Sequence, residues 1–205
     1  RTYENDKYVK FLKQKQIPFV AVGKFPDDDV VQVDHDNVGA CKELVTVLFA
    51  KGIQNIAYLG SNMDQMVNRC RYQGYEEAYR KGKRKLNQDL VYTDLSSRAM
   101  VEKAVEELKK SGVECILCQD DYICDEVVRK LARMGVRIPD QMKVASCHYS
   151  RILENYPVTI TSLKFNITEL GRRSCQVLLD MIHGKTVPDK TLLDYEIILK
   201  ESTKG

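Results

Sequence analysis

The strongest constraint in this sequence is a repeated alternation between short apolar runs and longer segments of mixed polarity. Each run has three to five residues and few charges, which is typical of strands that are buried on both faces of a parallel sheet. The predicted strands lie at 19–22, 30–33, 55–59, 90–92, 115–118, 143–146, 160–163 and 195–199. This spacing leaves room for a helix between most pairs of consecutive strands.

The intervening segments have the periodicity and the end signals of helices. Tyr8, Phe11 and Leu12 share one helical face because they are spaced i, i+3, i+4. Asp36 or Asn37 can cap a helix that runs to residue 50, since a short polar side chain accepts a hydrogen bond from the first turn. The predicted helices cover 7–15, 37–50, 67–81, 97–110 (capped by Ser96 or Ser97), 121–134 and 168–183. Together these elements predict βαβ units and an α/β fold with parallel sheets.

The composition excludes several classes of protein. The 32 Lys and Arg residues nearly balance the 29 Asp and Glu residues, and a net charge of +3 is too small to predict nucleic-acid binding on electrostatic grounds. The longest apolar stretches, such as 44–50, are far shorter than the ~20 residues that span a bilayer, so no membrane partner is predicted. Seven cysteines, an odd number without the spacing of a disulfide framework, predict a reducing, cytoplasmic location.

The sequence patterns that could indicate catalysis or metal binding are either absent or have a spacing that does not bring the side chains together. The sequence contains neither GxGxxG nor GxxxxGK[ST], the loops that cradle nucleotide phosphates. Cys147 and His148 are adjacent in an extended segment, so their side chains point to opposite faces and cannot form a nucleophile–base pair. Cys115 and Cys118 also lie on opposite faces of a strand, which favours core packing over a metal site. No enzyme activity, cofactor or metal is therefore predicted.

Polar residues at strand ends are better candidates for ligand binding. Asp120 and Asp121 directly follow one predicted strand, and His148 follows another. Arg71 lies near the start of a predicted helix. Because the carboxyl ends of parallel strands face the ligand crevice, these groups could together bind a hydroxylated or anionic small molecule. The pattern leaves an alternative equally open, in which each residue is a helix cap or part of a surface ion pair.

Eight sequence blocks resemble, in family order, the lactose-repressor/galactose-repressor (LacI/GalR) family of transcriptional regulators. They are VDHDNVG at 33–39, GIQNIAYLG at 52–60, RYQGYEEA at 71–78, CQDD at 118–121, GVRIPDQMKV at 135–144, PVTITSL at 157–163, ELGRRSCQVLL at 169–179 and ILKEST at 198–203. Each block is weakly specific, but the series covers nearly the whole chain.

The resemblance implies a periplasmic-binding-protein-like fold. In that fold, two three-layer α/β/α subdomains with parallel sheets are joined by three crossings, here expected near 33–37, 161–164 and 187–192. The N-terminal subdomain is expected to comprise 1–33 and 164–186 and to be incomplete, because its first βαβ portion is not in the sequence. The C-terminal subdomain is expected to comprise 36–160 and 191–205. The helix-turn-helix domain that reads DNA in this family is expected to be absent from this chain.

The resemblance also assigns candidate effector-binding residues. Arg71 matches the family Arg that forks onto effector hydroxyls or carboxylates, and Asp120 matches the Asn/Asp that orients a ligand hydroxyl. His148 lies where most sugar-responsive members have Asp, and Gly23 lies where some have another Asp. Both departures remove carboxylate acceptors, on which sugar recognition depends. The resemblance implies a sugar or a related metabolite as the effector, whereas these two departures leave a phosphorylated, anionic or absent ligand open.

Two further assignments follow from the same resemblance. Asp94 or Leu95 is expected at the floor of the pocket. Ile152, Leu153 and Tyr156 are expected on a loop that packs against a partner in a homodimer, although a place in the local core is equally compatible with their apolar character.

The sequence therefore predicts the effector-binding and dimerisation core of a LacI-type regulator. Such a core binds its effector between the subdomains and reaches operator DNA only through the absent domain. The alternative is a periplasmic or membrane-tethered solute-binding protein of the same fold, against which the seven thiols argue.

Overall fold

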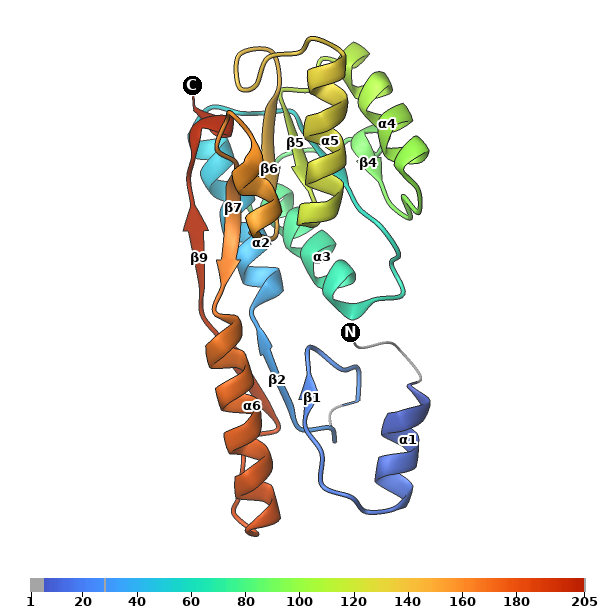
Figure 1. Cartoon of the computed structure of the whole chain (residues 1–205), viewed down its shortest axis with the longest axis vertical. Helices are drawn as coiled ribbons and strands as arrows, with labels where there is room; N and C mark the ends of the chain where they lie inside the picture. Colours follow the sequence, from blue (N-terminus) through green and yellow to red (C-terminus); the bar gives the residue numbers. More distant parts are fainter. Residues whose placement is uncertain (1–5, 28, 205) are drawn as a thin grey trace.

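Two sheets of unequal size organise the chain (Figure 1). The computed structural model describes residues 6–27 and 29–204. In this part of the chain, the larger sheet has the strand order β4-β3-β5-β6-β7-β9 and the smaller one the order β1-β2-β8. All neighbouring strands are parallel except β7 and β9, which are antiparallel. The strands are β1 Ala21–Val22, β2 Gln32–His35, β3 Ile56–Leu59, β4 Val91–Tyr92, β5 Cys115–Cys118, β6 Lys143–Ser146, β7 Thr161–Phe165, β8 Lys190–Leu193 and β9 Tyr195–Ile198.

The helices begin and end close to the predicted residues. They are α1 Lys7–Gln14, α2 Asn37–Ala50, α3 Met66–Lys81, α4 Arg98–Lys110, α5 Asp121–Arg133 and α6 Ile167–Ile182, with short 3₁₀ helices at Gln88–Leu90, Arg151–Asn155 and Glu201–Thr203. Of the two candidate caps of α2, Asp36 accepts the hydrogen bond, from the backbone N–H of Gly39 at 2.8 Å. Ser97 caps α4 in the same way. The predicted α/β class is confirmed.

The strands of the larger sheet alternate between two apolar cores. Tyr58 of β3 packs with α2 and α3, whereas Leu59 packs with α4 and α5 on the other face. In β5, Leu117 and Cys118 divide between the same two cores. Because successive strand residues point to opposite faces, an uninterrupted apolar run is what a sheet covered by helices on both sides requires. The larger sheet is therefore the centre of a three-layer α/β/α unit.

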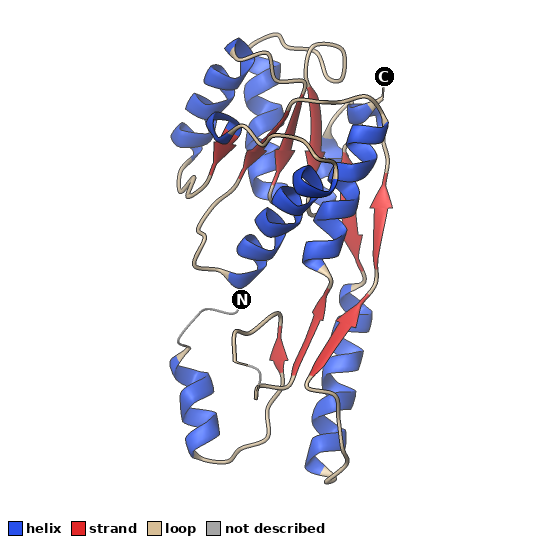
Figure 2. Cartoon of the chain, turned by 180° about the vertical axis from the view of Figure 1, so that it is seen from behind, coloured by secondary structure: helices blue, strands red, loops and turns tan. Residues whose placement is uncertain are grey.

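Three connections join the two sheets (Figure 2). Strand β2 of the small sheet leads into α2, β7 of the large sheet leads into α6, and β8 leads into β9. Helix α6 packs against β1 and β2 of the small sheet. The carboxyl ends of the large sheet therefore face the lobe that contains the small sheet (Figure 1).

Strand β8 was not predicted from the sequence. Its side chains alternate between exposed and half-buried positions, and it begins with Lys190, so it lacks the continuous apolar run of the other strands. Because β8 pairs with β2, the small sheet extends to Leu193, at the end of the segment 187–192 where a crossing was expected. Likewise β7 continues to Phe165, beyond the predicted crossing at 161–164. The wider division into two subdomains stays a prediction.

Membrane insertion has no helical candidate in the described ranges. None of the helices between residues 6 and 204, residue 28 aside, combines the length and the apolar character that crossing a bilayer requires.

The contact between α2 and α3 depends on Gly74, and we expect Gly74→Ala to destabilise the protein by about 1–3 kcal/mol through overpacking. A Cβ atom at this position would lie 2.4 Å from the backbone O of Val38 and 2.8 Å from the Cβ of Cys41, and neither atom can move without a shift of α2. The free energy of unfolding in urea measures the effect.

Gly171 of α6 provides the matched control. An added Cβ there meets nothing within 4 Å, so Gly171→Ala should be neutral or stabilise the protein by up to about 1 kcal/mol through helix propensity. Equal effects of the two substitutions would contradict the packing argument.

Candidate functional site

Arg71 is a buried cation at the carboxyl end of the large sheet. Its side chain is only 7% exposed. Its Nε donates to Oδ1 of Asn37 at 3.3 Å, and its Nη1 donates to the backbone O of Gln119 at 3.0 Å. The guanidinium carbon lies 6.0 Å from the centre of the Phe165 ring. The positive charge of Arg71 is therefore stabilised by two neutral hydrogen-bond acceptors and by the face of an aromatic ring. These three groups come from three separate segments of the chain.

Gln119 joins the ends of two neighbouring strands. It is fully buried directly after β5, and its side chain exchanges two hydrogen bonds with Ser61 after β3, at 3.0 and 3.2 Å. A Cβ atom at Gly60 would lie 2.6 Å from Oε1 of Gln119, so this contact requires glycine. Gln119 thereby places the carbonyl that accepts from Arg71.

Asn37 connects the same site to the crossing between β2 and α2. Its Nδ2 donates to the backbone O of His35 at 3.1 Å and to the carboxylate of Asp34 at 3.4 Å, while its Oδ1 accepts from Arg71. Burial raises the pKa of Asp34, although hydrogen bonds from neighbouring backbone N–H groups act in the opposite direction. Arg71 is thus linked through Asn37 to the last residues of the small sheet.

His148 lies on the other side of this site. Its Nδ1 is 3.2 Å from Oδ1 of Asp121, and its ring is stacked on Phe165 with centroids 6.2 Å apart and planes 20° apart. Burial alone would raise the pKa of Asp121, but hydrogen bonds from His148 and Ser150 and the charge of His148 lower it to about 2. Asp121 therefore stays ionised near neutral pH and holds the imidazole in place.

Phe165, at the end of β7 in the large sheet, also contacts the small sheet. Besides Arg71 and His148, it contacts His35 of β2, whose ring lies 4.9 Å away at 48°. His35 is 6% exposed, its Nε2 has no hydrogen-bond partner in the described part of the chain, and burial lowers its pKa. We call Arg71, His35, His148 and Phe165 the Phe165 cluster. Its members come from the small sheet and from three segments of the large unit.

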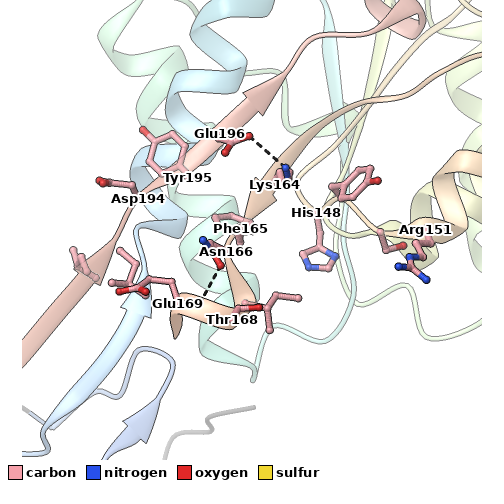
Figure 3. A pocket seen from close by; sticks show the side chains of 15 residues that line it. His148, Arg151, Lys164, Phe165, Asn166, Thr168, Glu169, Asp194, Tyr195 and Glu196 are labelled. Atoms are coloured by element: carbon pink, nitrogen blue, oxygen red, sulfur yellow. Dashed lines mark hydrogen bonds and ion pairs between the residues drawn. The ribbon is translucent and has the colours of Figure 1, made fainter. Parts of the chain in front are cut away.

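A groove of about 880 Å³ opens beside this cluster (Figure 3). It is lined by the loop after β6, the end of β7, the first turn of α6 and the segment where β8 passes into β9. His148 and Phe165 belong to both the groove and the cluster, and Lys164 and Glu196 form an ion pair of 3.6 Å along its wall. The volume suits a small ligand of a few hundred Å³.

The other predicted effector residues are more dispersed. Asp120 caps α5 by accepting from the N–H of Ile123 at 2.9 Å. Asp94 is exposed and accepts from Met63, Leu95 is buried in the core beside α4 and α5, and Gly23 pairs with β2. Within the described ranges, no hydrogen bond or ion pair joins these residues to Arg71 or His148. Their roles in effector binding stay predictions.

The three residues expected at a dimer face differ in exposure. Leu153 is 3% exposed and packs in the core with α4 and α5. Tyr156 is half-buried, and its hydroxyl donates to the backbone O of Asp125 at 3.3 Å. Ile152 is partly exposed. A contact with a second chain stays a prediction for this segment.

Sequence reasoning missed three site residues that the structure brings together: Asn37, Gln119 and Phe165. Gln119 directly follows the apolar run 115–118 and precedes Asp120, but a neutral amide at a strand end does not by itself indicate ligand binding. As for metals, the ranges 6–27 and 29–204 contain no group of three or more His, Cys, Asp or Glu side chains that could hold an ion.

The fold and this strand-end site define a class of ligand-binding α/β protein, and comparison with known sequences identifies it. The profile of the periplasmic binding protein-like domain matches residues 45–203, so the chain belongs to that family. The predicted fold family is thereby confirmed.

More specific relatives are regulators of transcription. The chain is 26% identical over 206 residues to the HTH-type transcriptional regulator CelR of Thermobifida fusca. The aligned region covers 98% of this chain and 61% of CelR. A structure of a LacI-type regulator from Bacillus cereus subsp. cytotoxis has a TM-score of 0.90 at 25% identity, covering 99% of this chain and 74% of that one. A CelR–cellobiose complex has a TM-score of 0.88 at 24% identity, covering 98% and 63%.

These relatives confirm the resemblance to LacI-type regulators. They are regulators of transcription, which supports the prediction that this chain is not an enzyme. The chain spans about three fifths of the length of the CelR sequence that it matches.

Because of the ion pair between Asp121 and His148, we expect the free energy of unfolding to depend on pH in the acid range. Because the folded-state pKa of Asp121, about 2, is lower than its ordinary value of 3.8, the pair stabilises the protein above pH 4 and its contribution is lost as the pH falls toward 2. With allowance for solvent screening, Asp121→Asn should lower the free energy of unfolding by about 1–2 kcal/mol at pH 6.

Urea unfolding at pH 6, 4, 3 and 2 measures this contribution. The difference between wild type and Asp121→Asn should shrink between pH 4 and pH 2, and a difference that stays constant over this range would contradict the assignment. Asp125→Asn, which alters another carboxylate on α5, provides a comparison.

Proposed function

We propose that this chain is the effector-binding core of a LacI-type bacterial transcriptional regulator. Its effector, a sugar or a related metabolite, binds where the carboxyl ends of the large sheet face the small sheet. The proposal is supported by membership of the periplasmic binding protein-like family and by similarity to CelR, a regulator for which a complex with cellobiose is known. Operator binding then belongs to a separate DNA-reading domain.

The buried guanidinium of Arg71 is the observation that carries this proposal. An Arg side chain has five N–H donors, and two of them are used by Asn37 and Gln119. A rigid, permanently charged fork at the carboxyl ends of parallel strands suits the oxygen atoms of a small ligand. Phe165 and His148 supply flat faces in the adjoining groove, against which a ring can pack.

The position of the site explains how binding could reach a distant domain. The Phe165 cluster combines His35 of the small sheet with Arg71 and His148 of the large unit. A ligand that contacts both units favours the arrangement in which they are close together. The equilibrium between arrangements shifts only by the difference in affinity of the ligand for the two, and a difference of about tenfold corresponds to 1.4 kcal/mol.

The proposed setting is a homodimer in the bacterial cytoplasm, with the segment of Ile152, Leu153 and Tyr156 at the interface. The seven cysteines, all present as free thiols, support a reducing compartment. At the interface, Ile152 is the member of this segment best suited to contact a partner, since Leu153 already packs within its own chain.

Substitution of Arg71 tests the proposed site. We expect Arg71→Ala to weaken effector binding roughly ten- to hundredfold, because a charged hydrogen bond contributes about 1.5–3 kcal/mol. Calorimetry with a panel of neutral sugars, cellobiose included, and of sugar acids and sugar phosphates first finds a ligand and then measures the loss. Arg137→Ala, at an exposed Arg that pairs with Asp140, serves as the control and should bind as wild type does.

Circular dichroism must show that Arg71→Ala remains folded. Unchanged affinity in a folded Arg71→Ala protein would refute this placement of the site.

A charge at Ile152 tests the proposed dimer. We expect Ile152→Glu to convert a dimer to a monomer, because a carboxylate would be buried without a partner at the interface. Gel filtration with light scattering gives the mass of each species. Leu199→Glu, at a residue that is 50% exposed elsewhere, should leave the mass unchanged. A wild-type chain that stays monomeric at high concentration would overturn this proposal.

A further inference from the structure

The charge balance around Arg71 points to a particular class of ligand. A guanidinium cannot lose its proton at physiological pH, so its burial must be offset by other charges or by hydrogen bonds. Only 7% of the surface of Arg71 is exposed. Its hydrogen-bond partners are nevertheless neutral, namely a side-chain amide and a backbone carbonyl. Among the described residues, no carboxylate forms an ion pair with it.

The carboxylates of neighbouring segments are already engaged elsewhere. Asp34 accepts from the backbone N–H groups of Lys24 and His35 at 2.9 and 2.8 Å. Asp120 caps α5, and Asp121 holds His148. None of the three is available as a counter-ion for Arg71 without giving up its present donors. Arg71 is therefore a buried cation whose charge no carboxylate of the described residues offsets.

The groove also presents the imidazole of His148. Its Nδ1 is directed to Asp121, so its Nε2 is left for a ligand, to which it donates a hydrogen bond only in the protonated ring. Phe165 contacts both this imidazole and the guanidinium of Arg71. A neutral sugar needs acceptors for its hydroxyls, and carboxylates usually supply them; here the carboxylates of Asp34, Asp120 and Asp121 already accept from other groups, whereas Arg71 still has N–H donors to offer.

We infer that the effector carries an anionic oxygen group, a carboxylate or a phosphoryl group, that binds the free N–H donors of Arg71 beside Phe165 and His148. This inference rests on the proposed function, because it specifies the ligand of the same site. The fork of Arg71 matches either anion, since both present two oxygens to a pair of parallel N–H donors.

Simple anions test the inference without knowledge of the whole effector. The probes are inorganic phosphate and acetate, added to the 205-residue chain and compared with chloride at equal ionic strength, with thermal unfolding and calorimetry as readouts. Phosphate or acetate should raise the unfolding temperature above the chloride control in a saturable manner. A stronger response to phosphate indicates a phosphoryl group, and a stronger response to acetate indicates a carboxylate.

Variants of Arg71 decide whether the response comes from this site. Arg71→Met keeps the apolar stem and removes the charge, and it should weaken anion binding at least tenfold. Arg71→Lys keeps a charge but loses the planar fork, so it should bind more weakly than wild type; it also serves if Arg71→Met fails to fold. Arg137→Met should respond as wild type does, because its Arg is exposed and paired with Asp140.

Two results would overturn the inference: no stabilisation by either anion beyond that of chloride, or a response that persists in both Arg71 variants. If a neutral sugar such as cellobiose then binds in an Arg71-dependent manner, the proposed function stands and only the ligand class is wrong. If neither anions nor neutral sugars show binding that depends on Arg71, the inference fails and the proposed function loses its main support as well.

Discussion

The burial of the Arg71 guanidinium is the interaction around which the two halves of this molecule are arranged. A permanent charge removed from water must be given hydrogen bonds, and here they come from segments far apart in the sequence. Asn37 opens the helix after the first crossing, Gln119 ends a central strand, and Phe165 ends the strand before the second crossing. The register of the large sheet and the position of both crossings are therefore tied to one side chain.

Phe165 extends this arrangement to the small sheet. Its ring contacts His35 of β2 and His148 of the loop after β6 as well as Arg71. Under the proposed function, a ligand that binds beside Phe165 and contacts side chains from both units would couple its occupancy to their relative position. The coupling needs no long pathway through the core. It requires only two arrangements whose affinities for the ligand differ.

The site was partly accessible from the sequence. Arg71 and His148 could be singled out because they are charged or titratable and lie next to predicted strand ends. Asn37 and Gln119 could not, since neutral amides are common as helix caps and surface residues and carry no periodic signal. Phe165 looked like any apolar residue at the end of a strand. Its importance arises from rings and a cation that converge on it from residues 35, 71 and 148. Leu153 shows the converse, because its apolar character left a dimer face and the local core equally open, and its side chain packs in the core with α4 and α5.

The order of helices and strands, the α/β class and the parallel character of the larger sheet could be predicted from the amino-acid pattern. This is because side-chain periodicity and helix caps are local properties, which do not depend on the tertiary structure. Strand β8 could not be predicted, because it is an edge strand of alternating exposure that begins with Lys190 and contains no continuous apolar run. In addition, its pairing partner β2 is distant in the sequence. The same distinction applies to function. The sequence indicated which residues could bind a ligand, whereas the cost of burying Arg71 without a carboxylate depends on neighbours that only the folded chain brings together.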